Sequence, residues 1–105
     1  MYWIYILIAA VFEISWAVGL KYSNGFTNLK ASIFTVITMV LSYIFLSLGV
    51  KGLPIGTAYA VWTGIGAVGT ALYGILFFNE SKEVLRILFL LLIFAGIIGL
   101  KFTSK

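Results

Sequence analysis

One carboxylate stands out in this 105-residue sequence because it lies in the middle of an apolar stretch. Glu13 is one of three acidic residues, and no Lys or Arg occurs in residues 2–20 around it. A charged side chain at the centre of a bilayer costs about 2.5 to 3.5 kcal/mol. Burial in hydrocarbon favours the neutral carboxyl group, so a proton or a mobile cation is expected to neutralise it. Glu13 is therefore the candidate proton and cation site; the alternative is a protonated side chain that only makes an interhelical hydrogen bond.

Aromatic residues with polar atoms recur at a spacing of three residues. Trp16 follows Glu13 by three positions, so both lie on one face of a helix, and Tyr59 and Trp62 repeat the spacing. The faces of such rings attract organic cations, although each ring alone is as typical of packing or lipid contact. Ser42, in a further apolar stretch, is a candidate donor to the carboxylate, or else bonds to its own helix backbone.

Several other kinds of site are excluded by residue type. The sequence contains no Cys and no His, which rules out thiol chemistry and the usual ligands of zinc and haem. Gly64, Gly66 and Gly69 match the dinucleotide motif G-x-G-x-x-G, but they lie inside an apolar stretch with no preceding strand. We expect Gly64 and Gly66 to permit a helix bend or close packing. No enzyme activity, metal or cofactor is expected.

The composition determines what kind of element must position these residues. Hydrophobic residues make up 63% of the chain and charged residues 10%, with a mean hydropathy of +1.17. A soluble fold of this size cannot bury so much apolar surface. The seven basic residues are scattered singly, so the net positive charge does not indicate nucleic-acid binding. The sequence predicts an all-α membrane protein surrounded by lipid.

Four apolar stretches are each long enough to cross a bilayer as a helix. We place them at about residues 2–20, 31–50, 55–78 and 84–101, separated by short polar or turn-forming segments. These spans use nearly the whole chain, which predicts a single four-helix transmembrane domain over residues 1–105. Any binding site must then lie between helices.

Basic residues give almost no preference for either orientation in the membrane. Four spans put both chain ends on one side, with three basic residues there and four on the opposite side: Lys51, Lys101 and Lys105, against Lys21, Lys30, Lys82 and Arg86. A chain without a bias can insert in both directions and form an inverted pair. We expect a dual-topology antiparallel homodimer, and interpret Ala95, Gly96 and Gly99 as its seam because small residues let helices approach closely.

The sequence resembles the small multidrug resistance transporters over its whole length, and most closely their guanidinium-exporter branch. The matching segments are Glu13 with Trp16 to Lys21, Asn24 to Thr27, Leu53 to Gly66, and Gly96 to Lys101. The sequence departs from the family pattern at Ala10, a position that is often Gly, and at Tyr43, a bulkier residue than expected.

The resemblance implies a multi-pass protein of the bacterial inner membrane that exports guanidinium in exchange for protons. It also implies a shared site at the Glu13 pair of an antiparallel homodimer, lined by Trp16, Ser42, Tyr59 and Trp62. Trp16 narrows the pocket, because the drug-exporting branch typically has a small residue there. The alternatives are a polyspecific exporter of quaternary ammonium or drug cations, one half of a heterodimeric transporter, and a non-transporting membrane subunit.

Overall fold

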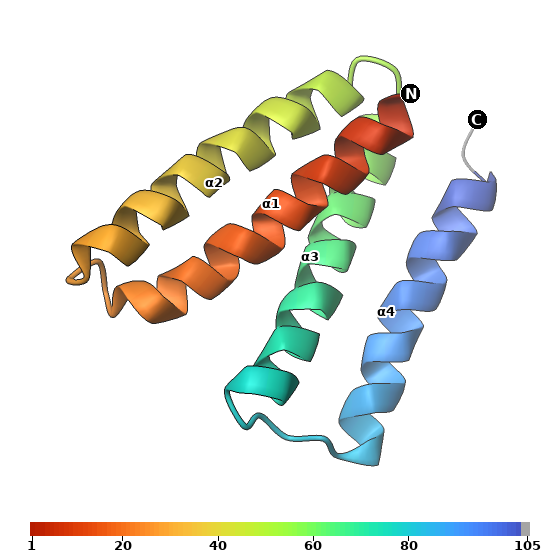
Figure 1. Ribbon diagram of the computed structural model, residues 1–105. Coiled ribbons are helices and arrows are strands. Elements are labelled where there is room, and N and C mark those ends of the chain that lie inside the picture. Colours follow the sequence, from red (N-terminus) through yellow and green to blue (C-terminus); the bar gives the residue numbers. More distant parts are fainter. Residues whose placement is uncertain (104–105) are drawn as a thin grey trace.

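The computed structural model describes residues 1–103, which form four α-helices joined by short connections (Figure 1). The helices are α1 (Tyr2–Ser23), α2 (Leu29–Gly49), α3 (Ile55–Phe77) and α4 (Val84–Thr103). Each has 20 to 23 residues and is apolar enough to cross a membrane. At a rise of ~1.5 Å per residue, such helices span the ~30 Å of a hydrocarbon core. The expected set of four transmembrane helices is confirmed.

Local capping determines where the helices begin and end. α1 continues three residues beyond the expected position 20, until Asn24 takes up a left-handed conformation with φ 49°. The side chain of Asn28 then begins α2 by accepting a hydrogen bond from the Ala31 N–H at 3.2 Å. Pro54 directly precedes α3, where its missing N–H costs nothing.

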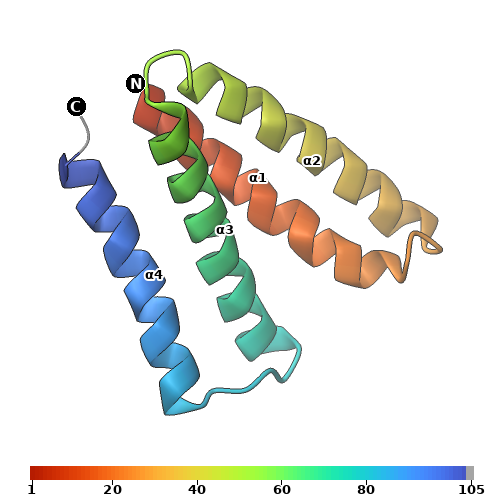
Figure 2. The ribbon, with the colours of Figure 1, turned by 180° about the vertical axis from the view of Figure 1, so that it is seen from behind.

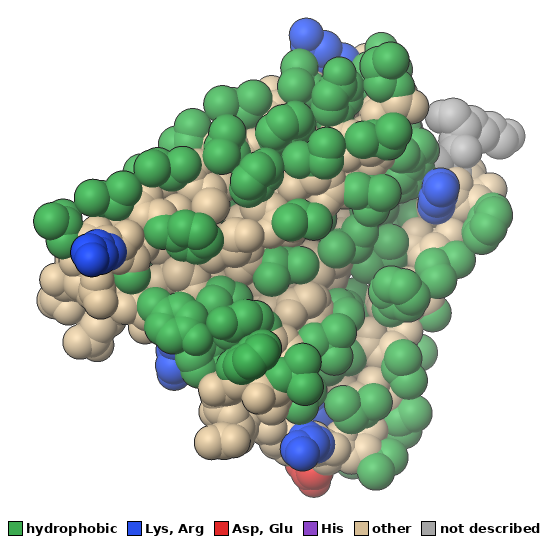
Figure 3. Space-filling model, in the orientation of Figure 1, with side chains coloured by type: hydrophobic (Ala, Val, Ile, Leu, Met, Phe, Trp, Pro, Cys, Tyr) green, Lys and Arg blue, Asp and Glu red, His purple; other side chains and the backbone are tan. Residues whose placement is uncertain are grey.

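Large apolar side chains cover the outside of the bundle. Figure 3 shows them over most of one face, with Lys and Arg side chains at the ends of the helices. On α4 only Ile97 is buried, while Leu85, Phe89 and Leu92 are each at least 60% exposed. Such a surface requires lipid or another apolar partner around it. The chain is a multi-pass membrane protein.

α1 and α2 lie closest together because small residues alternate with larger ones along their contact. A Cβ atom at Gly19 of α1 would overlap the Thr35 side chain, and a Cβ atom at Gly49 of α2 would overlap Ile6. The missing side chains at these glycines, near opposite ends of the pair, therefore allow the two backbones to approach.

α3 joins the other helices into one bundle. Its backbone runs close to those of α1 and α4, and α3 is the only described helix whose backbone runs close to that of α4; Figures 1 and 2 show α4 set apart from α1 and α2 in both views. The buried apolar core lies where the helices meet and consists of Ile6, Ala9, Ala10, Ala58, Val61, Trp62 and Ile97.

The N-terminus, the C-terminal end of α4 and the turn between α2 and α3 lie at one end of the bundle (Figure 2). We call this the terminal end. Lys51 and Lys101 belong to it, whereas Lys105, the third lysine expected there, lies outside the described residues. The opposite end holds the α3–α4 loop, where Glu80 forms an ion pair at 2.7 Å with Arg86 in the first turn of α4.

Candidate functional site

Glu13 lies in the middle of α1 and is half-buried. Its Oε2 atom is inaccessible to solvent, and no described residue gives it a hydrogen bond. The Nε1 atom of Trp16, one helical turn further on, is also buried and without a partner. Buried polar atoms are almost always paired in folded proteins. Among the described residues, Glu13 and Trp16 thus present a buried acceptor and a buried donor without partners on one helix face.

Ser42 connects three helices near this carboxylate. Its side chain is fully buried and donates a hydrogen bond of 2.7 Å to the carbonyl oxygen of Ala9 on α1. The Trp62 indole N–H of α3 donates to the Ser42 hydroxyl at 2.8 Å. The two partners expected for Ser42 were the carboxylate and its own helix; the structure instead joins it to α1 and α3. Ala9 precedes Glu13 by one turn, so this bond holds the backbone that carries the carboxylate.

The rings of two tyrosines pack against the ring of Trp62. Tyr59 of α3 and Tyr43 of α2 each lie with their ring centroids 5.6 Å from that of Trp62, at interplanar angles of 56° and 53°. Such tilted arrangements are favourable for aromatic pairs. Trp62 is buried, whereas Tyr59 is 57% exposed. The sequence predicted Tyr59 and Trp62 as lining but not Tyr43, whose position next to Ser42 was the available signal.

Gly66 provides space for the Glu13 side chain. A Cβ atom at Gly66 would overlap the Glu13 carboxylate, so the carboxylate packs directly on the backbone of α3. A Cβ atom at Gly64 would meet the end of the Ile97 side chain of α4, at 2.9 Å. α3 is one continuous helix across both glycines. In this structure, Gly64 and Gly66 are thus close-packing positions.

The structure does not bring all five predicted site residues together. Glu13, Ser42 and Trp62 gather where α1, α2 and α3 meet, and Tyr59 joins them through Trp62. Within residues 1–103, no hydrogen bond or ring contact connects Trp16 to the other four. The Trp16 indole thus lies on the same helix face as Glu13 but is not joined to the other predicted site residues.

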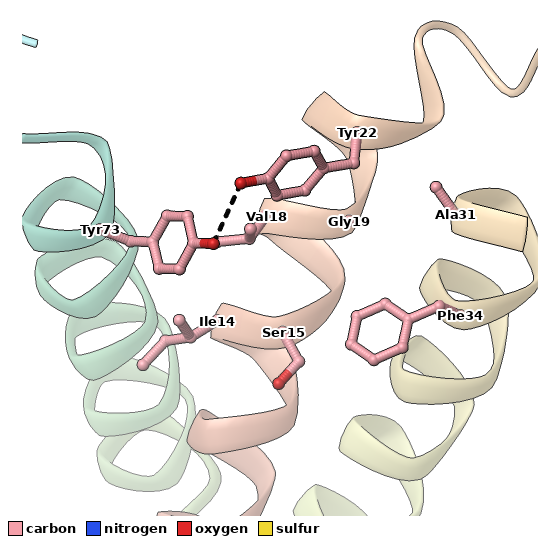
Figure 4. A pocket seen from close by; sticks show the side chains of 8 residues that line it. All are labelled: Ile14, Ser15, Val18, Gly19, Tyr22, Ala31, Phe34 and Tyr73. Atoms are coloured by element: carbon pink, nitrogen blue, oxygen red, sulfur yellow. Dashed lines mark hydrogen bonds between the residues drawn. The ribbon is translucent and has the colours of Figure 1, made fainter. Parts of the chain in front are cut away.

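A hollow of about 430 Å³ lies next to this cluster, between α1, α2 and α3 (Figure 4). Ser15 and Phe34 line it, and Tyr22 and Tyr73 meet at one side with their hydroxyl oxygens 3.1 Å apart. None of the five predicted residues is among its described lining residues. The Tyr22–Tyr73 pair joins α1 to α3, a contact that residue spacing could not reveal because 51 positions separate the two.

The small residues of α4 lie on its open side. Ala95, Gly96 and Gly99 are exposed, and a Cβ atom at Gly96 or Gly99 would meet no atom within 4 Å. This part of α4 therefore has no partner among the described residues, and a second helix would find space there.

Comparison with known proteins places the chain in a family. The sequence profile of the small multidrug resistance proteins matches residues 1–93. The chain belongs to the small multidrug resistance family. It is 57% identical over 104 residues to the guanidinium exporters of Proteus vulgaris and Yersinia pestis, which covers 99% of this chain and 100% of each relative. The guanidinium exporter of Salmonella typhi is also 57% identical, with 99% of both proteins covered.

Family membership confirms the resemblance and identifies the chain as a transporter rather than an enzyme. Transport requires a site that binds its cargo reversibly inside the membrane. No group of three or more metal-ligating residues occurs in the described part of the chain. Among the buried side-chain atoms of the described residues, the Oε2 atom of Glu13 is the one carboxylate oxygen without a hydrogen-bond partner.

Proposed function

We propose that this chain exports guanidinium across the bacterial inner membrane in exchange for protons. The observation that carries the proposal is the buried Oε2 atom of Glu13, which has no hydrogen-bond partner in residues 1–103. The one ion pair within residues 1–103 joins Arg86 to Glu80, so no described basic residue forms an ion pair with Glu13. A proton and a guanidinium ion each satisfy the carboxylate, and each excludes the other.

Guanidinium fits the chemistry of this cluster. It is a planar cation whose N–H groups form forks, so a carboxylate can accept two parallel hydrogen bonds from it. The rings of Trp62 and Tyr59 and the indole of Trp16 offer faces that attract a cation. A quaternary ammonium ion has no N–H group to donate. The relatives named guanidinium exporters, 57% identical to this chain, support the same substrate.

Exchange follows from the charge of the site in each state. With a proton or a guanidinium ion bound, the carboxylate carries no net charge, and its exposure can change from one side of the membrane to the other. The empty carboxylate is charged, and moving it through hydrocarbon is costly. Reorientation then occurs mainly with one of the two species bound, which couples proton entry to guanidinium exit.

We further propose that two copies assemble as an antiparallel homodimer with both Glu13 residues at one shared site. One copy leaves Tyr59 largely exposed and supplies only three helices around Glu13, which is too few to enclose a cargo. The nearly equal numbers of basic residues on the two sides support insertion in both directions. The open face at Gly96 and Gly99 offers the seam for the second copy.

Transport by the purified chain, reconstituted alone into liposomes, tests the function. We expect a guanidinium gradient to drive proton movement in the opposite direction, and Glu13→Gln to abolish it. Tetramethylammonium, which has no N–H group, is expected to compete poorly. Transport of alkylated ammonium ions at the guanidinium rate would instead assign a polyspecific drug exporter. A chain that is inert alone but active with a co-expressed relative would be half of a heterodimer.

A further inference from the structure

A second groove lies between α1, α3 and α4. The backbone of α1 runs close to those of α2 and α3 but not to that of α4, and the space between α1 and α4 forms a groove of about 290 Å³. Val61 and Ile65 of α3 line it together with Leu7 of α1 and Ile98 of α4. These side chains are all apolar, so the groove suits a hydrocarbon chain.

One end of this groove carries a charged and an amphipathic side chain. Trp3 and Lys101 line it at the terminal end of the bundle, and the Lys101 Nζ atom lies 5.8 Å from the centre of the Trp3 ring. Lys101 is exposed. Trp and Lys are typical of the membrane interface, where an indole lies at headgroup level and an ammonium group reaches the phosphates. The groove therefore runs from an apolar interior to a positive charge at the membrane surface.

No acidic side chain of the described residues lies at this end of the bundle. The three acidic residues of the chain are Glu13, in the middle of α1, and Glu80 and Glu83, in the loop at the opposite end. Lys51 adds a second positive charge at the terminal end. Anionic lipids attract basic residues near the surface with about 1 kcal/mol each. The surroundings of Lys101 thus favour a negatively charged headgroup.

We propose that the groove between α1 and α4 binds an anionic phospholipid, with one acyl chain along Leu7, Val61, Ile65 and Ile98 and the phosphate at Lys101. A phospholipid matches the groove because it joins an apolar acyl chain to a charged headgroup. The lipid fills the gap that α1 and α4 leave and connects the two helices. This site is separate from Glu13 and does not depend on the transported substrate.

Lipid retention by the purified protein tests the site. Native mass spectrometry in detergent, with phosphatidylglycerol or phosphatidylcholine titrated in, measures the affinity for the first bound lipid. We expect phosphatidylglycerol to bind about fivefold more tightly than phosphatidylcholine. Lys101→Gln is expected to remove this preference. Lys51→Gln is the matched control, because it removes the same charge from the same end at a residue outside the groove, and it keeps the preference.

Filling the groove provides a second variant. Leu7→Trp replaces an aliphatic side chain by a larger indole ring at a half-exposed position. Because the ring fills part of the groove, we expect weaker binding of both lipids. Equal binding of the two lipids to the unaltered protein would overturn the proposal, as would an equal loss of preference in Lys51→Gln. A change in the ratio of monomer to dimer in Lys101→Gln, with lipid retention unchanged, would assign the groove to a second copy of the chain instead.

Discussion

The Glu13 carboxylate occupies the space that a side chain at position 66 would fill. A Cβ atom at Gly66 would overlap the carboxylate, and overpacking of this kind costs about 1 to 3 kcal/mol. Glycine at this position therefore permits the close contact between the charge-bearing side chain of α1 and the backbone of α3. The position of the carboxylate depends on both residues.

Replacing Gly66 is expected to disturb the cation site without unfolding the helix. We predict that Gly66→Ala raises the Kd for guanidinium about tenfold, the equivalent of about 1.4 kcal/mol, because the carboxylate must move. Isothermal titration calorimetry in detergent measures this constant. Gly56→Ala is the control on the same helix, since a Cβ atom there meets nothing within 4 Å. Unchanged affinity in Gly66→Ala would show that this contact does not position Glu13.

Glu13 was predictable as a candidate from the sequence because a carboxylate in a long apolar stretch is conspicuous by residue type alone. Its contact with Gly66 was not predictable, since 53 positions separate the two and their distance depends on how α1 and α3 cross. The partners of Ser42 were missed for the same reason. A spacing rule compares residues on one helix, whereas Ser42 bonds to Ala9 on α1 and Trp62 on α3.

At the level of the helices, Ser42 is the one buried hydroxyl in the described residues that bonds to two other helices. It fixes α2 to the α1 backbone one turn before Glu13, and it fixes the Trp62 indole. Hydrogen bonds between transmembrane helices contribute about 0.6 kcal/mol on average. Removing the hydroxyl also leaves the indole N–H without an acceptor, which adds a desolvation cost.

We predict that Ser42→Ala destabilises the folded protein by about 1 to 3 kcal/mol. Ser47→Ala is the matched control on the same helix, because Ser47 is exposed and bonds only to the Ile44 carbonyl of its own helix, at 2.7 Å. Its effect is expected to stay within about 0.5 kcal/mol. Thermal unfolding in detergent, followed by circular dichroism, compares the two variants. Equal stability of the two would exclude a structural role for the link between the three helices.

The helix spans were predictable to within a few residues because lipid imposes a strong length and composition rule on each of them. The predicted first span ends at residue 20, three residues before the end of α1 at Ser23. Hydropathy falls at Lys21, but the helix continues until Asn24 adopts a left-handed conformation. A lysine at a helix end extends its charge to the headgroups, so a fall in hydropathy does not mark the end of a helix.

At the level of the whole molecule, one chain leaves much of its apolar surface uncovered. The outer face of α4 carries Gly96 and Gly99 with open space around them. We predict that Gly96→Leu lowers the fraction of dimer in chemical crosslinking, because the larger side chain separates two closely packed helices. Helical content by circular dichroism is expected to stay unchanged, since a Cβ atom at Gly96 meets no described atom within 4 Å. An undiminished dimer would mean that the seam lies elsewhere.

The organisation of residues 1–105 as one domain and the antiparallel pairing of two copies stay predictions. The sequence predicted Ala95, Gly96 and Gly99 as the dimer seam because small residues let helices approach closely; the structure leaves these residues exposed, and the seam itself stays a prediction. The groove between α1 and α4 could not be predicted. It forms because α3 is the only described helix whose backbone runs close to that of α4, and the sequence of a single span does not reveal which helices approach one another.

Competition between a proton and guanidinium at Glu13 is the central claim, and proton release on binding measures it most directly. Purified protein in weakly buffered detergent receives guanidinium at a series of pH values, and a pH indicator records the change. We predict that binding releases protons at acidic pH, where the carboxyl group is protonated, and that release disappears as the pH rises and no proton remains. Glu80→Gln, which removes an exposed carboxylate, is expected to release protons as the unaltered protein does. Guanidinium binding without proton release at any pH, or the same release from Glu13→Gln, would contradict the account.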